Sequence, residues 1–70
     1  MHKTNFKEAT KDLKIGDRVH VEIMGFPFEN YTRVGKLVGL DEEDFALLLD
    51  GDIGYLHSYR RVISIKKVNK

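Results

Sequence analysis

Hydrophobic and polar side chains alternate between Arg18 and Met24, and this alternation constrains the fold more than any other feature. Val19, Val21 and Ile23 occupy every second position of the segment. A period of two places such side chains on one face of a β-strand, so the segment is predicted to be a half-buried strand. A single strand is not stable alone, and the rest of the chain must supply its partners.

Four more strands are predicted downstream, separated by turn-forming residues. Gly35 and Gly39 inside the second strand indicate strong bending or a bulge. Asp50-Gly51-Asp52 favours a hairpin turn, because Asp-Gly tolerates positive φ. The four strands are predicted at residues 32–40, 45–49, 53 to 57 or 59, and 62–68. Short, bent strands joined by tight turns are typical of a small barrel.

A short helix is predicted over residues 5–14, before the first strand. Asn5 is a favourable N-cap, and Glu8 stands at the third helical position of a box-like arrangement. Phe6 and Leu13 fall on one helix face and must pack on the barrel, since a helix of this length is unstable alone. The expected fold class is mainly β: one domain over residues 1–70, with a five-stranded SH3-like (Sm-like) barrel at about 18–68.

The chain is small and has no disulfide bond to stabilise it. It has 70 residues and no cysteine, so a lone core leaves little surplus stability. Association is the remaining stabiliser, and five strands leave at least one sheet edge for pairing with another copy. We therefore expect a homo-oligomer.

The side-chain sets that catalysis and cofactor binding require are missing from the sequence. There is no nucleophile motif and no phosphate-binding loop, and His2, His20 and His57 match no zinc spacing. No apolar run approaches the ~18 residues that cross a bilayer. We expect a cytoplasmic protein that is not an enzyme and has no cofactor, metal or membrane partner.

The charges are segregated along the chain. Residues 41–52 hold six carboxylates and no Lys or Arg, whereas the charges from Arg60 onward are all positive. Such asymmetry indicates an anionic partner for one surface. The alternative is that these are the solvated charges that any highly charged small protein carries.

Aromatic and cationic residues interleave between positions 55 and 61. Rings stack on nucleic-acid bases at about 1–3 kcal/mol each, and arginine adds phosphate or base contacts. The members of this candidate patch are Tyr55, His57, Tyr59, Arg60 and Arg61. In the alternative interpretation, the tyrosines cover the barrel end and the arginines are solvated.

A second aromatic group lies in the predicted loop after the first strand. It contains Phe26, Pro27, Phe28, Tyr31 and Arg33. Each ring offers about 150 Å² or more of apolar surface, which is unfavourable in water. Either these rings fold back over the barrel mouth as core, or they form a protein-contacting patch.

The order of these residues resembles a known family. Val-x-Val-x-Ile-x-Gly-Phe at 19–26, Gly-Lys-Leu-x-Gly-Leu-Asp at 35–41 and Phe-x-Leu-Leu at 45–48 are similar to the first motif of Sm-like proteins, particularly the Hfq-like bacterial RNA chaperones. Tyr-Arg-Arg-Val-Ile-Ser at 59–64 resembles that family's second motif, Tyr-Lys-His-Ala-Ile-Ser. The acidic turn at 41–44 is longer than the family's turn.

The resemblance implies a ring of protomers joined by edge-strand pairing, with single-stranded, uridine-rich RNA in the pore. Arg60 and Arg61 stand where the family has its pore Lys and His, and Phe45 stands at the base-stacking position. The expected RNA-binding residues are Arg60, Arg61, Tyr59, Tyr55, His57, Phe45 and Lys36.

An SH3-like adaptor or inhibitor of protein partners is the alternative function. It would dock through the acidic turn or the aromatic loop. The residues expected to carry that contact are Phe26, Phe28, Tyr31, Glu42 and Glu43.

Overall fold

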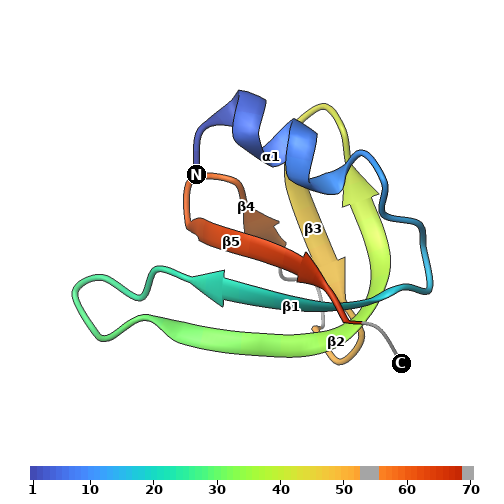
Figure 1. Cartoon of the computed structure of the whole chain (residues 1–70). Helices are drawn as coiled ribbons and strands as arrows, with labels where there is room; N and C mark the ends of the chain where they lie inside the picture. Colours follow the sequence, from blue (N-terminus) through green and yellow to red (C-terminus); the bar gives the residue numbers. More distant parts are fainter. Residues whose placement is uncertain (53–55, 69–70) are drawn as a thin grey trace.

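The computed structural model describes residues 1–52 and 56–68, and within them one helix precedes five strands (Figure 1). The elements are α1 (Lys3–Thr10), β1 (Arg18–Ile23), β2 (Tyr31–Asp41), β3 (Ala46–Leu49), β4 (His57–Ser58) and β5 (Val62–Lys67). The predicted mainly β fold class is confirmed, and four strands lie within about a residue of their predicted bounds. The fourth predicted strand falls partly on residues 53–55, which lie outside the described residues.

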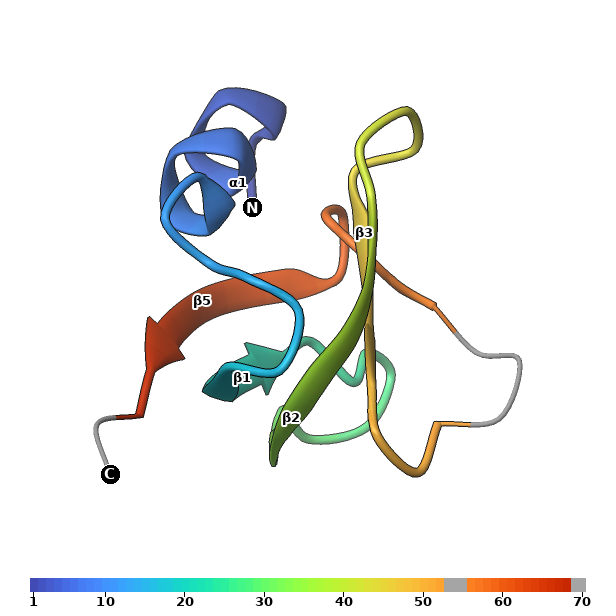
Figure 2. The same cartoon turned by 90° about the vertical axis from the view of Figure 1, so that its right-hand side faces the viewer.

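All five strands form one antiparallel sheet in the order β4-β3-β2-β1-β5. The long strand β2 pairs with β1 on one side and with β3 on the other. Lys36 faces Arg18 of β1, and Asp41 faces Ala46 of β3. The register shifts between Leu37 and Gly39, where the sequence predicted a bend or bulge. Figure 2 shows β2 and β3 turning away from β1 and β5, with α1 on the inner side of that angle.

Gly35 is buried at the point where the β3–β4 turn approaches β2. The Oδ1 atom of Asp50 accepts a hydrogen bond from the Lys36 amide at 3.0 Å. A Cβ atom at position 35 would lie 2.5 Å from that same oxygen. The glycine therefore lets a carboxylate bind the backbone of β2.

The core follows the alternation of β1. Val19, Val21 and Ile23 are fully buried, as their period of two predicted. Burial of each such side chain contributes about 1.5–3 kcal/mol. The remaining buried side chains of the same cluster come from α1, β2, β3 and β5, and are Phe6, Leu37, Leu47, Leu49 and Val62.

The N-terminus of α1 differs from its prediction. The helix begins at Lys3, and His2 is its N-cap, with Nδ1 accepting from the amide of Thr4 at 3.4 Å. The predicted cap at Asn5 is wrong, because Asn5 lies inside the first turn of the helix. Histidine is not among the strong cap formers, so the sequence pattern favoured the asparagine instead.

The helix also ends earlier than predicted, at Thr10. The Thr10 hydroxyl donates to the Phe6 carbonyl at 2.9 Å, and the chain then turns, with the Leu13 amide donating to the Thr10 carbonyl. Leu13 lies beyond the helix, yet it still packs against the core. Among residues 1–52 and 56–68, no helix has the length and apolar character of a membrane span.

Candidate nucleic-acid interface

Two aromatic rings and two cations meet where α1 passes the β4–β5 turn. The rings of Phe45 and Tyr59 lie edge to face, with centroids 5.9 Å apart. The Lys3 Nζ atom is 5.4 Å from the Phe45 centroid and 6.0 Å from that of Tyr59, and the Arg60 Cζ atom is 5.5 Å from the Tyr59 centroid. We call Lys3, Phe45, Tyr59 and Arg60 the aromatic–cationic cluster.

Backbone and side-chain hydrogen bonds hold Phe45, Tyr59 and Arg60 of this cluster together. The Tyr59 amide donates to the Phe45 carbonyl at 2.8 Å, and the Met1 amino group donates to the Tyr59 carbonyl at 3.0 Å. The Arg60 Nε atom donates to the Tyr59 hydroxyl at 3.2 Å. Segments from the two ends of the sequence are thereby fixed beside the β2–β3 turn, which carries Phe45.

The backbone of Phe45 is in the left-handed region, with φ of 53°. This conformation costs a non-glycine residue on the order of 1–2 kcal/mol, and such strain is concentrated at functional sites. Its ring is half-buried between Phe6, with centroids 6.4 Å apart, and Tyr59. The strained position in the β2–β3 turn therefore carries a half-buried aromatic ring, where a small turn residue would be usual.

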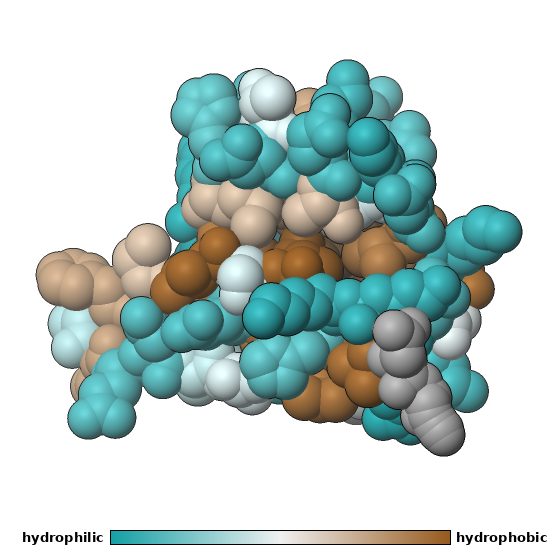
Figure 3. Space-filling model, in the orientation of Figure 1, coloured by the Kyte–Doolittle hydropathy of each residue, from teal (hydrophilic) through white to brown (hydrophobic). Residues whose placement is uncertain are grey.

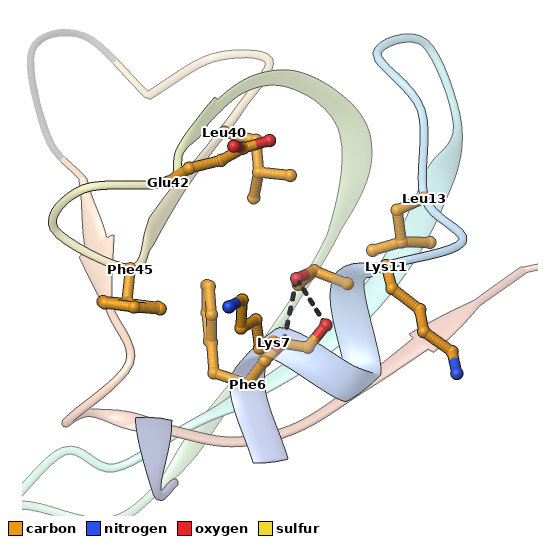
Figure 4. Close-up of a pocket in the computed structure, with 8 residues that line it drawn as sticks. Phe6, Lys7, Lys11, Leu13, Leu40, Glu42 and Phe45 are labelled. Atoms are coloured by element: carbon orange, nitrogen blue, oxygen red, sulfur yellow. Dashed lines mark hydrogen bonds between the residues drawn. The ribbon is translucent and has the colours of Figure 1, made fainter. Parts of the chain in front are cut away.

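A pocket of about 380 Å³ opens next to the cluster, between α1 and the β2–β3 turn (Figure 4). Apolar side chains form much of its wall, while Lys7 comes from α1, Lys11 is the C-cap of α1, and Glu42 comes from the turn. Figure 4 shows Phe6 and Phe45 side by side at one end and Leu13 at the other. The complete lining is Phe6, Lys7, Thr10, Lys11, Leu13, Leu40, Glu42 and Phe45.

The acidic turn is ordered by its own first carboxylate. The Oδ1 atom of Asp41 accepts from the amides of Glu43 at 3.0 Å and Asp44 at 3.1 Å. Glu42 and Glu43 both line an open recess with Leu48 and Leu56. Glu42 also lines the pocket beside α1, and Glu43 does not.

His57, one of the predicted RNA-binding residues, is buried in the structure. Only 3% of its side chain is exposed, and its Nε2 atom lies 2.9 Å from Oδ2 of Asp52. The other Asp52 oxygen accepts from Arg33 at 2.6 Å, and Oδ2 also accepts from the Leu49 amide at 3.1 Å. We call Asp52, His57 and Arg33 the buried polar triad.

Two opposing influences set the pKa of Asp52. Burial is the largest single one and acts to raise the pKa. The hydrogen bonds from Arg33, the Leu49 amide and His57 act in the opposite direction and together hold the pKa of Asp52 below its ordinary value. Asp52 is therefore a structural carboxylate that stays ionised, and it ties the β3–β4 connection to β2.

Two other predicted RNA-binding residues, Arg61 and Lys36, are not part of the cluster. The Arg61 guanidinium donates to the Met24 carbonyl at 3.2 Å, near the β1–β2 loop. Lys36 is exposed in the middle of β2, opposite Arg18. Tyr55 lies outside the described residues. The sequence reasoning missed Lys3, whose contacts with Phe45 and Tyr59 join positions more than forty residues apart and have no local signal.

The β1–β2 loop does not fold back as core. Phe26 and Phe28 are 76% and 82% exposed, and Tyr31 is 41% exposed. Figure 3 shows hydrophobic side chains at the surface of this projecting loop, whereas α1 presents mainly hydrophilic side chains. Of the two interpretations of the aromatic loop, the structure therefore excludes burial in the core.

Within residues 1–52 and 56–68, no group of three or more His, Cys, Asp or Glu side chains is arranged to hold a metal ion. What the arrangement offers is a surface of rings and cations beside a partly apolar pocket. No protein-family model matches the chain, and neither a curated protein nor a solved structure matches it significantly.

Proposed function

We propose that the chain is a single-stranded RNA-binding domain of the Sm-like barrel type, which binds as a homo-oligomer and catalyses no reaction. The observation that carries this proposal is the aromatic–cationic cluster. Single-stranded nucleic acids are bound by rings that stack on bases and by cations that contact phosphates, and both are present within about 6 Å of one another.

The helix extends the cationic surface away from the cluster. Lys3, Lys7 and Lys11 follow one another at intervals of four, so they lie along one side of α1 and its C-cap. Lys7 and Lys11 line the pocket next to the cluster. A strand whose base stacks on Phe45 or Tyr59 has lysines within reach of its neighbouring phosphates.

Edge pairing supports assembly into an oligomer. β4 and β5 are the two outer strands of the sheet, and an outer strand offers unpaired backbone groups to another chain. Pairing of β4 in one copy with β5 in the next would repeat around a ring. We expect light scattering after size exclusion to give a molar mass several times the 8.1 kDa of one chain. A monomer at micromolar concentration and physiological salt would contradict the oligomeric part of the proposal.

Arg60→Ala is expected to weaken binding of a fluorescent oligouridine by roughly tenfold, because the change removes a charge and the cation over Tyr59. The slope of log affinity against log salt should also fall, by about 0.7 for each lost phosphate contact. Fluorescence anisotropy at several salt concentrations measures both quantities.

Arg18→Ala is the matched control for this measurement, because Arg18 is an exposed arginine of β1 outside the cluster. It removes the same charge and should leave the affinity within about twofold. Equal losses for Arg18→Ala and Arg60→Ala would mean that net charge alone governs binding. The cluster would then have no special part in it.

Protein docking through the β1–β2 loop is the second candidate, and the 76% and 82% exposure of Phe26 and Phe28 favours it. Two phenylalanines on a projecting loop are typical anchors of a protein contact. This function makes no use of Arg60. A chain that binds no single-stranded RNA at physiological salt would therefore favour the loop over the cluster.

A further inference from the structure

The pocket between α1 and the β2–β3 turn combines an aromatic wall with charges of opposite sign. Phe6 and Phe45 lie at one end of it, and Lys7 and Glu42 come from opposite sides (Figure 4). Its volume of about 380 Å³ is at the lower end of the range for small-molecule sites. A ligand that fits this chemistry has a flat apolar body, an anionic group for the lysine and hydrogen-bond donors for the glutamate.

We propose that the pocket binds one guanine nucleotide of the single strand, with Glu42 accepting hydrogen bonds from the base and Lys7 contacting a phosphate. This inference rests on the proposed function and names the base that the site selects. Phe45 belongs to both the cluster and the pocket, so one strand can occupy the two together.

The choice of guanine follows from the donor pattern of the bases. A carboxylate only accepts hydrogen bonds, and it has two oxygens side by side. Guanine presents two adjacent donors, N1–H and the N2 amino group, on its Watson–Crick edge. Uracil presents one donor between two carbonyl oxygens, while adenine and cytosine each place an amino group beside an acceptor nitrogen. Guanine is therefore the standard base that satisfies both carboxylate oxygens.

The two charged groups are available to a ligand, and Glu42 stands on an ordered turn. The Asp41 carboxylate orders the turn on which Glu42 stands. Lys11 forms an ion pair with Glu8 at 3.2 Å, whereas no ion pair engages Lys7 or Glu42 within the part of the chain that the structure describes. Both side chains are exposed at the mouth of the pocket, so their substitution does not disturb the core.

The test compares guanosine, inosine and uridine 5′-monophosphates by NMR titration of the full chain. We expect guanosine monophosphate to bind on the order of tenfold more tightly than uridine monophosphate, with inosine monophosphate between them because it lacks the N2 amino group. The shifted amides should belong to α1 and the β2–β3 turn. Glu42→Gln should abolish the preference, since an amide offers one acceptor and one donor group.

Asp44→Asn is the matched control, because it removes the same charge from an exposed residue of the same turn. It should preserve the preference for guanine. Lys7→Gln should lower the affinity for all three nucleotides by a similar factor. Lys66→Gln, which changes an exposed lysine of β5, should leave these affinities unchanged. Equal affinities for guanosine and uridine monophosphate, or a preference that survives in Glu42→Gln, would overturn the inference.

The experiments distinguish failure of the guanine site from failure of the proposed RNA-binding function. Oligouridine binding that depends on Arg60, with no preference among the mononucleotides, leaves the RNA-binding function standing and overturns the guanine site. A guanine preference that depends on Glu42, in a chain that binds no oligonucleotide, overturns the RNA-binding function and supports the pocket as a nucleotide site.

Discussion

Phe6→Ala is expected to lower the free energy of unfolding by about 3–5 kcal/mol, the usual cost of removing a buried phenylalanine ring. Phe6 is 2% exposed and is the one hydrophobic side chain that α1 places in the buried cluster. A helix of eight residues is unstable without such packing, so loss of the ring should also release α1 from the sheet. The Phe45 ring would lose its edge-to-face neighbour at 6.4 Å.

Denaturant unfolding measures the change in free energy, and hydrogen exchange of the α1 amides measures release of the helix. Asn5→Ala is the control, because Asn5 is the exposed neighbour of Phe6 in the same helix. Its effect should stay within about 0.5 kcal/mol. A loss below about 1 kcal/mol for Phe6→Ala would show that α1 does not depend on this contact.

Asp52→Asn is expected to cost about 2–4 kcal/mol, because it breaks the buried polar triad while leaving the triad's other groups in place. The carboxylate accepts from Arg33 at 2.6 Å and from the Leu49 amide at 3.1 Å, and it lies 2.9 Å from His57 Nε2. An amide offers only one acceptor oxygen, so at least one of these partners loses its bond. Thermal unfolding of the two proteins at neutral pH measures the difference.

The same carboxylate gives a pH dependence of known sign. Its pKa in the folded state lies below the ordinary value of 3.8, so the ionised form stabilises the fold. That contribution is complete above pH 3.8 and is lost as the pH falls through the folded-state pKa. Asp52→Asn should therefore lose less stability than the unaltered chain on acidification below about pH 4. The exposed control Asp12→Asn should keep the steeper loss; identical acid dependence in all three proteins would contradict the assignment.

The strands could be predicted because their signals are local. The period of two around Val21 specifies which face of β1 is buried, and glycines mark where β2 bends. The start of α1 could not be predicted, because a moderate cap at His2 competes with a better cap former at Asn5. Phe6 of this helix packs in the core cluster, and no short sequence window contains that contact.

The residues of the candidate site also divide into those with a local sequence signal and those without one. Phe45, Tyr59 and Arg60 could be identified from residue type and from the resemblance, and the structure brings them together. The burial of His57 could not be predicted, because its contact with Asp52 depends on the folded chain. Lys3 was missed for the converse reason, since only the folded chain brings it over two distant rings.

The central position of β1 also determines when the sheet can form. One of its two partners is β5, whose paired residues lie about forty to fifty positions further along the chain. Closing so long a loop costs chain entropy before strand pairing contributes any stabilising free energy. The sheet is therefore expected to form late and cooperatively. An incomplete chain leaves one edge of β1 open to other copies. Every nascent molecule therefore passes through an interval in which self-association competes with folding, until β5 has joined β1.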